Sequence, residues 1–205
     1  MFDNFVKQMT ARETGTEQLI KDTAKRVFFA EGKLHATTQE IADAAGISRT
    51  SLHYYYRSRD ELMKQVFNEA VTALNDKLYN LMGADLPFAE KIEKMVNLFL
   101  TESMEYPYKG TFLITEMLAN DKDLYKMKEQ GYPHIKIFLK EVEKEMKAGN
   151  ISKMNPVQFM MNMFALTSYP LLMRPLHKSL LNLTDEQYTR LMNERKKLVV
   201  DILLR

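Results

Sequence analysis

Apolar residues recur at intervals of three and four along nearly the whole chain, the spacing that places them on one face of an α-helix. Glycine and proline are few, and the alternating β-branched runs with hairpin turns that would indicate strands are missing. The pattern therefore predicts an all-α protein with about nine helices. The predicted helices cover residues 15–31, 38–45, 49–55, 59–82, 88–105, 110–119, 121–148, 156–174 and 185–204.

Capping residues mark the predicted helix ends. A hydroxyl side chain followed three residues later by Glu or Gln satisfies N–H groups at a helix start, and asparagine before proline also opens a helix. Glycine closes a helix because it adopts the left-handed conformation without steric cost. The expected starts are Thr14-x-x-Glu17, Thr37-x-x-Glu40, Ser58-x-x-Glu61, Asn155-Pro156 and Thr184-x-x-Gln187, and the expected stops are Gly32, Gly46, Gly83 and Gly149.

The first three predicted helices are short and closely spaced, whereas the later ones are long. This asymmetry predicts a compact N-terminal head, residues 1–62, and a larger helical body, residues 63–205. Within the head, Gly46 separates two short helices, and Ala42 is small enough to let them approach closely. Two short helices that meet at about a right angle around a glycine turn form a helix-turn-helix unit. Helix 15–31 supplies the third wall of its core.

The second short helix leaves a polar stripe outside when Leu52 and Tyr56 point into the core. Arginine makes bidentate hydrogen bonds to guanine, hydroxyl residues contact bases or phosphates, and tyrosine donates to phosphate oxygens. Helix N-termini also favour phosphate, because their N–H groups point outward. The stripe therefore indicates a surface for double-stranded DNA, made of Arg49, Thr50, Ser51, His53, Tyr54 and Tyr55.

Residues 34–62, LHATTQEIADAAGISRTSLHYYYRSRDEL, resemble the DNA-binding head of the tetracycline-repressor (TetR) family of bacterial regulators. The shared pattern is T-T-x-x-I-A-x-x-A-G-[VI]-S, a short run ending in an aromatic residue, and then S-[KR]-[DE]-x-L. The resemblance implies a symmetric dimer whose second short helix enters the major groove of a pseudo-palindromic operator. It also implies a small molecule that binds the body and weakens operator binding.

The resemblance also implies roles for individual positions. Thr38 and Gln39 would touch phosphate or a base edge, and Arg59 would contact phosphate. His53 stands where the family usually has tyrosine, and Thr50 stands where glycine, alanine or proline is frequent, so the operator is not inherited from a relative. The residues in or beside the groove would be Arg49, Thr50, Ser51, Tyr54 and Tyr55.

Charge and composition narrow the function classes. The net charge of +2 excludes a polyanion binder that is basic throughout, and positive charge is instead local to Arg49, Arg57 and Arg59. The absence of cysteine excludes disulfides, thiolate zinc sites and cysteine nucleophiles, and a cytoplasmic location is expected. The four histidines share no metal-binding spacing, and no hydrolase or nucleotide-binding motif occurs, so no enzyme activity, cofactor or metal is expected. Neither a signal peptide nor a membrane span is expected.

Methionine and aromatic residues are dense in segments 104–138 and 159–173. Methionine is flexible and polarizable, which suits an adaptable apolar cavity, although its commoner use is ordinary core. Taken as a set, these residues predict a pocket for a small apolar or aromatic effector. The expected lining is Met104, Tyr108, Phe112, Met117, Tyr132, His134, Phe138, Met163, Thr167 and Tyr169.

Pro170 and Pro175 each remove a helical hydrogen bond, so helix 156–174 should kink or end near Tyr169. A homodimer is expected mainly through residues 156–174 and 185–204. The second of these segments is the better candidate, although the same residues also suit packing within one subunit. Its apolar positions are Leu191, Leu198, Val199, Ile202 and Leu203.

Three functions remain open from the sequence. The leading one is a dimeric DNA-binding transcriptional regulator, a repressor that a small molecule releases from its operator. The chief alternative is a helical small-molecule or protein-binding module whose head no longer binds DNA, and a helical enzyme comes third. Arg49, Arg57 and Arg59 together favour the first, because a head that no longer binds DNA should have lost its phosphate contacts.

Overall fold

A computed structural model describes residues 15–119 and 133–205, with the side chains of 116–119 excepted. All regular secondary structure in these residues is helical, which confirms the all-α prediction. None of the helices in these two ranges is long and apolar enough to cross a membrane.

The chain divides into two compact units, Met1–Thr72 and Ala73–Arg205. Helix α4 (Arg59–Gly83) begins in the first unit and ends in the second. The boundary that the sequence predicts after residue 62 therefore falls inside a helix. Because one helix supplies residues to both units, head and body are joined by regular backbone.

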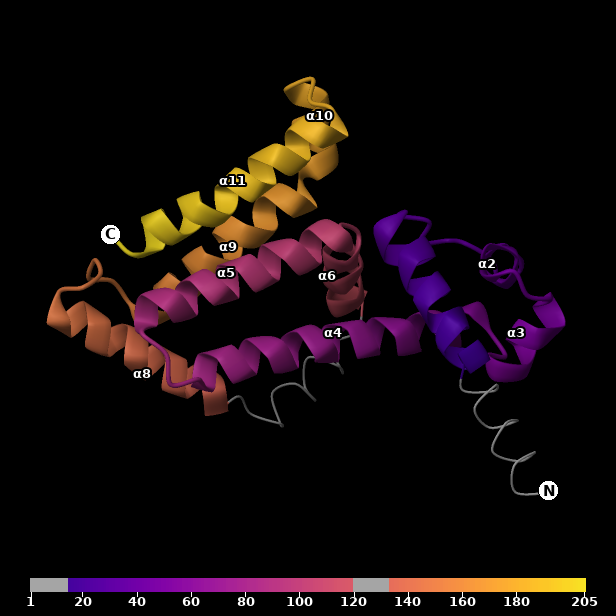
Figure 1. Ribbon diagram of the computed structural model, residues 1–205, viewed down its shortest axis with the longest axis horizontal. Helices are drawn as coiled ribbons and strands as arrows, with labels where there is room; N and C mark the ends of the chain where they lie inside the picture. Colours follow the sequence, from indigo (N-terminus) through magenta and orange to yellow (C-terminus); the bar gives the residue numbers. More distant parts are fainter. Residues whose placement is uncertain (1–14, 120–132) are drawn as a thin grey trace. The chain divides into compact units, whose positions relative to one another are not determined.

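The first unit consists of short helices around a small core (Figure 1). A helix over residues 15–25 continues into one π-helical turn, η1 (Arg26–Ala30), and α2 (Thr38–Ala45), α3 (Arg49–Tyr55) and the start of α4 follow. These elements match the predicted helices of the head. The core side chains with no exposed surface include Ile20, Phe28, Phe29, Ile41, Leu52 and Leu62.

The turn between α2 and α3 follows from three local signals. At the start of α2, the Thr37 hydroxyl accepts from the Glu40 N–H while the Glu40 carboxylate accepts from the Thr37 N–H at 2.8 Å, which completes the predicted capping box. Gly46, with φ of 68°, closes α2 in the left-handed conformation. Ser48 then caps α3 by accepting from the Ser51 N–H. Each signal fixes one end of a short helix.

Gly46→Val is expected to destabilise the head by about 1–2 kcal/mol, because a β-branched residue is strained at positive φ. An added Cβ at this position meets no atom within 4 Å, so the loss comes from backbone conformation alone. Gly46→Asn is the matched control, since asparagine tolerates the left-handed region better than valine. Urea unfolding followed by circular dichroism measures both variants. Equal losses for the two would contradict this account.

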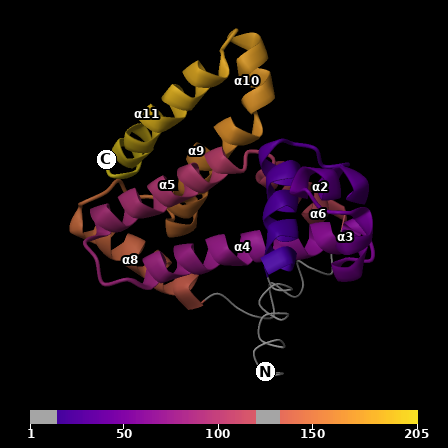
Figure 2. The same cartoon turned by 45° about the vertical axis from the view of Figure 1, so that its right-hand side comes forward.

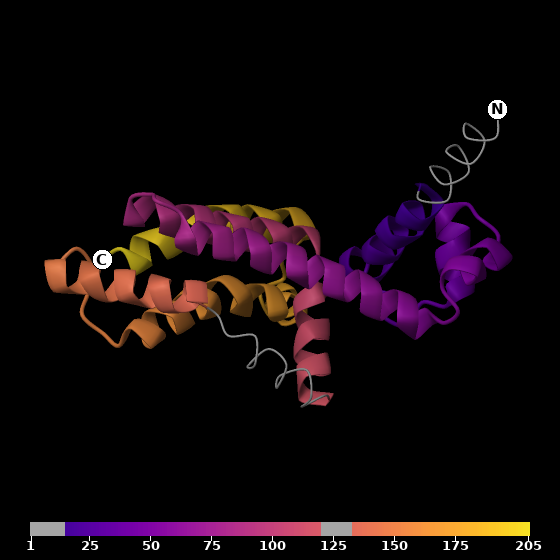
Figure 3. The same ribbon diagram turned by 90° about the horizontal axis from the view of Figure 1, so that it is seen from below.

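The second unit is a helical bundle formed by the end of α4 and the later helices (Figure 2). Helix α11 packs against α5 and α9, and α9 also packs against α8 (Figure 3). Phe88, Phe138 and Phe159 come from three different helices, and their ring centroids lie 5.9 to 6.5 Å apart at the centre of the core. The helices are α5 (Phe88–Glu105), α6 (Lys109–Ala119), α8 (Pro133–Ala148), α9 (Pro156–Leu172), α10 (Arg174–Leu180) and α11 (Asp185–Leu203).

The helices of this unit differ from the sequence prediction in two places. Residues 121–132, expected to open the helix that reaches 148, lie outside the described residues. The predicted helix 156–174 ends at Leu172, and the short helix α10 follows it without having been predicted. Pro175 stands in the first turn of α10, where a missing N–H costs nothing because that donor has no partner in a helix anyway.

Candidate nucleic-acid interface

Helix α3 is anchored on one side and open on the other. Leu52 has no exposed surface and Tyr56, directly after the helix, keeps only 2%. On the opposite side Tyr54 is 75% exposed. The structure therefore brings the predicted DNA residues of this segment onto one short helix, with Tyr55 half-buried and the others exposed: Arg49, Thr50, Ser51, His53 and Tyr54.

The exposed edge of α3 combines a cation, hydroxyl groups and aromatic rings. Tyr54 and Tyr55 pack edge to face with ring centroids 5.1 Å apart, which holds the more exposed ring in place. The Ser51 hydroxyl accepts a hydrogen bond from Ser48 at 3.0 Å and keeps its own hydrogen for another acceptor. Such groups can donate to phosphate and base edges at the same time.

The two predicted residues at the start of α2 have different surroundings. Thr38 is half-buried, and the helix cap is provided by Thr37. Gln39 is exposed, and its amide donates to the Asp43 carboxylate one turn later at 2.7 Å. That contact occupies one amide hydrogen and leaves the side-chain carbonyl of Gln39 as an acceptor.

Tyr56 ties the end of α3 to the first helix. Its hydroxyl donates to the Glu17 carboxylate at 3.3 Å. Burial, together with the charge on Glu17, raises the pKa of the Tyr56 hydroxyl, so it remains protonated and able to donate. The contact joins α3 to residues 15–25 and restricts how far the helix can rotate.

Arg59 is engaged inside the head. Its Nε donates to the carbonyl of Ala36 at 3.1 Å, and its guanidinium carbon lies 5.5 Å from the centre of the Phe28 ring. It also forms an ion pair with Asp60 at 2.6 Å, but Asp60 is 87% exposed, so water screens that pair. Because Ala36 directly precedes the cap of α2, these contacts hold the start of α2 against α4.

Arg59→Lys is expected to lower the free energy of unfolding by about 1–2 kcal/mol, because lysine keeps the charge but cannot both stack on Phe28 and donate to Ala36 in this geometry. Arg57→Lys is the control, since Arg57 is exposed. Thermal unfolding of both variants and the parent gives the comparison. If Arg59→Lys unfolded at the same temperature as the parent, only the charge of Arg59 would contribute to stability.

Sequence comparison identifies this head directly. Residues 20–66 match the family described as bacterial regulatory proteins, tetR family. The match runs from the first helix through α2 and α3 into α4, so it covers the whole helix-turn-helix. The head of this chain is a tetR-family head. The resemblance carried by residues 34–62 is thereby confirmed.

Individual proteins resemble part of this sequence or share its fold. The HTH-type transcriptional regulator NfxB of Pseudomonas aeruginosa is 33% identical over 82 residues, which is 40% of this chain and 41% of that protein. The chain thus matches less than half the length of this curated relative. A TetR/AcrR-family regulator of Thermobifida fusca has a TM-score of 0.63 at 12% identity, covering 92% of this chain and 97% of that one. A TetR-family regulator of Marinobacter aquaeolei has a TM-score of 0.59 at 16% identity, covering 94% and 97%.

The predicted effector residues of this chain do not all lie together. Phe138 is completely buried among the core rings, and His134 is half-buried, stacked on Tyr79 with ring centroids 5.9 Å apart. Tyr108 and Tyr169 are 37% and 55% exposed. Met104 and Phe112 are half-buried, whereas the side chain of Met117 and all of Tyr132 lie outside the described residues.

Met163 and Thr167 lie in one tightly packed region. Both are buried on α9, where α4, α5 and α9 pack together without leaving room for a water molecule. The Thr167 hydroxyl donates to the Met163 carbonyl at 2.8 Å, within its own helix. The other residues of this region were not among those predicted: Leu78, Met95, Val96, Phe99 and Phe164. Phe164 lies within the methionine-rich segment 159–173, whereas the other four lie outside both segments and show only ordinary helical spacing.

Proposed function

We propose that the chain is a DNA-binding transcriptional regulator that represses transcription as a homodimer on a pseudo-palindromic operator in double-stranded DNA. The observation that carries this proposal is the division of α3 into a buried side at Leu52 and an exposed side at Arg49 and Tyr54. A helix fits the major groove, which is about 12 Å wide, and reads bases there by hydrogen bonds and apolar contacts. Such a regulator acts in the cytoplasm and has no membrane partner.

A second apolar face on α11 supports the dimer. Leu191, Leu198 and Ile202 are 42%, 49% and 42% exposed. Apolar side chains on two sides of a helix are both removed from water only when each side packs against other residues. The core of the unit packs against only one side of α11. The face turned into that core includes Tyr188, Met192, Val199 and Leu203. The proposed interface comprises α11 together with α9. Val199 and Leu203, which the sequence placed among the dimer positions, are buried in the core of one subunit and are not part of the proposed interface.

A small apolar or aromatic effector is proposed to bind the second unit and release the operator. The region where α4, α5 and α9 pack around Met163 and Thr167 has no room for a water molecule, whereas typical ligand pockets enclose roughly 300–1,000 Å³, so binding requires this region to open. Met95 and Met163 line it, and flexible methionine side chains can change rotamer to make room. Because α4 supplies residues to both units, a displacement of its later turns is a physical route to the head.

Footprinting on the DNA that flanks the chain's own gene tests the proposed function. At fixed salt and with excess random-sequence competitor, we expect a protected pseudo-palindrome with half-sites about one helical turn apart, ~34–36 Å, or a multiple of it. Uniform weak binding that competitor removes would reject sequence recognition. The alternative of a module whose head no longer binds DNA would then be favoured.

A further inference from the structure

Three consecutive tyrosines at the end of α3 differ in their exposure. Tyr54 is 75% exposed, Tyr55 is half-buried, and Tyr56 keeps only 2% of its surface. The first two belong to the proposed DNA surface, whereas Tyr56 points into the core of the head. A phenylalanine would fill the same space in that core, so the hydroxyl of Tyr56 is the part that apolar packing does not explain.

The Tyr56 hydroxyl has its partner on the first helix, residues 15–25. It donates to Oε1 of Glu17 at 3.3 Å, although the two residues are 39 positions apart in sequence. A buried hydroxyl without an acceptor costs free energy, so the Glu17 carboxylate is what makes a tyrosine acceptable here. Glu17 precedes residues 20–66, the segment that matches the tetR family, so that match includes only one side of the contact.

Two further contacts hold the first helix and the π-helical turn that continues it against α4. Lys21 lies one turn after Glu17, and its ammonium forms an ion pair with the Glu69 carboxylate of α4 at 3.0 Å. Phe29, in η1, packs edge to face on Phe67 of α4, with ring centroids 6.0 Å apart. Because the first helix is fixed on α4, the Glu17 carboxylate is a fixed point for the end of α3.

Helix α3 is held at three points along its length. Ser48 caps its first turn, Leu52 anchors its middle in the core, and the hydroxyl of Tyr56 joins its far end to Glu17. Without the third point, a tilt of about 10° around Leu52 would move the backbone of Arg49, about 4.5 Å away, by about 0.8 Å. Hydrogen bonds to a base edge need placement within about 0.5 Å, whereas non-specific binding depends on charge and hardly responds to such a shift.

We propose that Glu17 is a positioning residue for sequence recognition, which acts through the Tyr56 hydroxyl to set the angle at which α3 presents Arg49 to the bases. This rests on the proposed function and adds a specificity-determining residue outside the DNA surface. The readout of this role is the ratio of operator affinity to random-sequence affinity. A role in stability alone would change the fraction of folded protein, and would therefore lower both affinities by the same factor.

Fluorescence anisotropy with random duplexes and the operator found by footprinting tests the proposal, at a temperature where circular dichroism shows each variant folded. Tyr56→Phe removes the hydroxyl and keeps the ring, and Glu17→Ala removes the acceptor. Each should lower the affinity ratio about 3- to 10-fold, within the range that the net free energy of one hydrogen bond permits. Glu17→Gln removes the charge but keeps an acceptor oxygen, so its ratio should stay within about 2-fold of the parent. Gln18→Ala, at an exposed position beside Glu17, is the matched control and should keep the parent ratio.

The double variant Y56F/E17A separates one shared contact from two independent effects. Both changes remove the same hydrogen bond, so its ratio should fall no further than that of the more affected single variant. Losses that multiply in the double variant, or a Glu17→Gln loss equal to that of Glu17→Ala, would overturn the positioning role. Parent-like ratios for Tyr56→Phe and Glu17→Ala, in a parent that prefers its operator, would overturn it too. A parent without any sequence preference would overturn the proposed function, and this inference with it.

Discussion

Arg49→Ala is expected to lose the preference for operator over random-sequence DNA by about 1–3 kcal/mol, roughly 5- to 150-fold in affinity ratio. Arg49 lies at the first position of α3 and is exposed, where a guanidinium can bond to the O6 and N7 of guanine. Alanine removes those bonds without touching the core of the head. Fluorescence anisotropy with operator and random duplexes, each at several salt concentrations, measures the ratio.

Arg57→Ala is the matched control for this loss. Arg57 is also exposed but follows α3, so its charge can reach phosphate without reading a base. We expect it to weaken binding to all sequences alike and to reduce the slope of log affinity against log salt by about 1. If the two variants behaved identically, the assignment of base contact to Arg49 and phosphate contact to Arg57 would be wrong.

Leu52→Ala is expected to destabilise the head by about 2–5 kcal/mol, the usual range for truncating a buried leucine. Leu52 is completely buried and is the buried residue within α3, so the cavity would remove the anchor of the whole helix. Operator binding should fall with it, because a detached α3 has to be reordered before it can enter the groove. Urea unfolding of the first unit within the intact chain gives the free energy.

Leu52→Met controls for the identity of the side chain. A swap that conserves volume costs less than about 1.5 kcal/mol in most cores, and methionine adapts to the available space. Operator affinity should therefore stay close to that of the parent. If alanine and methionine proved equally harmless, Leu52 could not be the residue that holds α3 in place.

The head could be predicted from the sequence because each of its boundaries has a local cause. Thr37 and Glu40 cap each other across one turn, and Gly46 adopts a conformation that few other residues accept. Leu52 and Tyr56 are one turn apart, so helical spacing alone places both on the inner side of α3. None of these inferences depends on a residue distant in the sequence.

The contacts of Arg59 could not be predicted in this way. Its partners Ala36 and Phe28 are more than twenty residues away, and helical spacing says nothing about which carbonyl a guanidinium reaches across a core. The sequence therefore assigns Arg59 only to phosphate, as the family resemblance implies. The structure adds a second role, which the lysine variant separates from the first.

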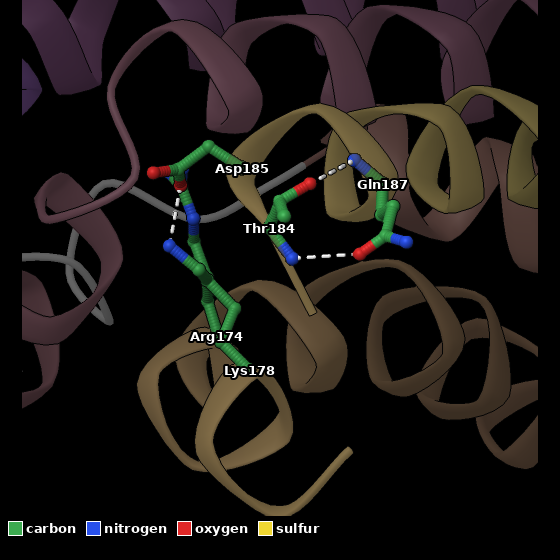
Figure 4. A network of polar contacts seen from close by, with 5 residues as sticks. All are labelled: Arg174, Lys178, Thr184, Asp185 and Gln187. Atoms are coloured by element: carbon green, nitrogen blue, oxygen red, sulfur yellow. Dashed lines mark hydrogen bonds and ion pairs between the residues drawn. The ribbon is translucent and has the colours of Figure 1, made fainter. Parts of the chain in front are cut away.

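Helix α10 was missed for a different reason. A proline inside a helical pattern predicts a break, and Pro170 and Pro175 together were interpreted as the end of one helix. Proline also suits the first turn of a new helix, and the sequence of seven residues after Met173 is too short to reveal apolar periodicity. Lys178 from α10 binds the carboxylate of Asp185 at the first position of α11 (Figure 4). One groove of about 550 Å³ is lined by side chains from α9, α10 and α11, and no local pattern in the sequence reports such an arrangement.

Site-directed DNA cleavage tests the central claim, that the exposed edge of α3 enters the major groove in two copies. The cysteine-free chain allows a single Thr50→Cys variant to carry an iron chelate that cleaves nearby DNA, and the unlabelled parent is the control. The account predicts two clusters of cleavage within the operator, centred about one helical turn apart or a multiple of it. Cleavage spread evenly along the duplex, or confined to its ends, would contradict it.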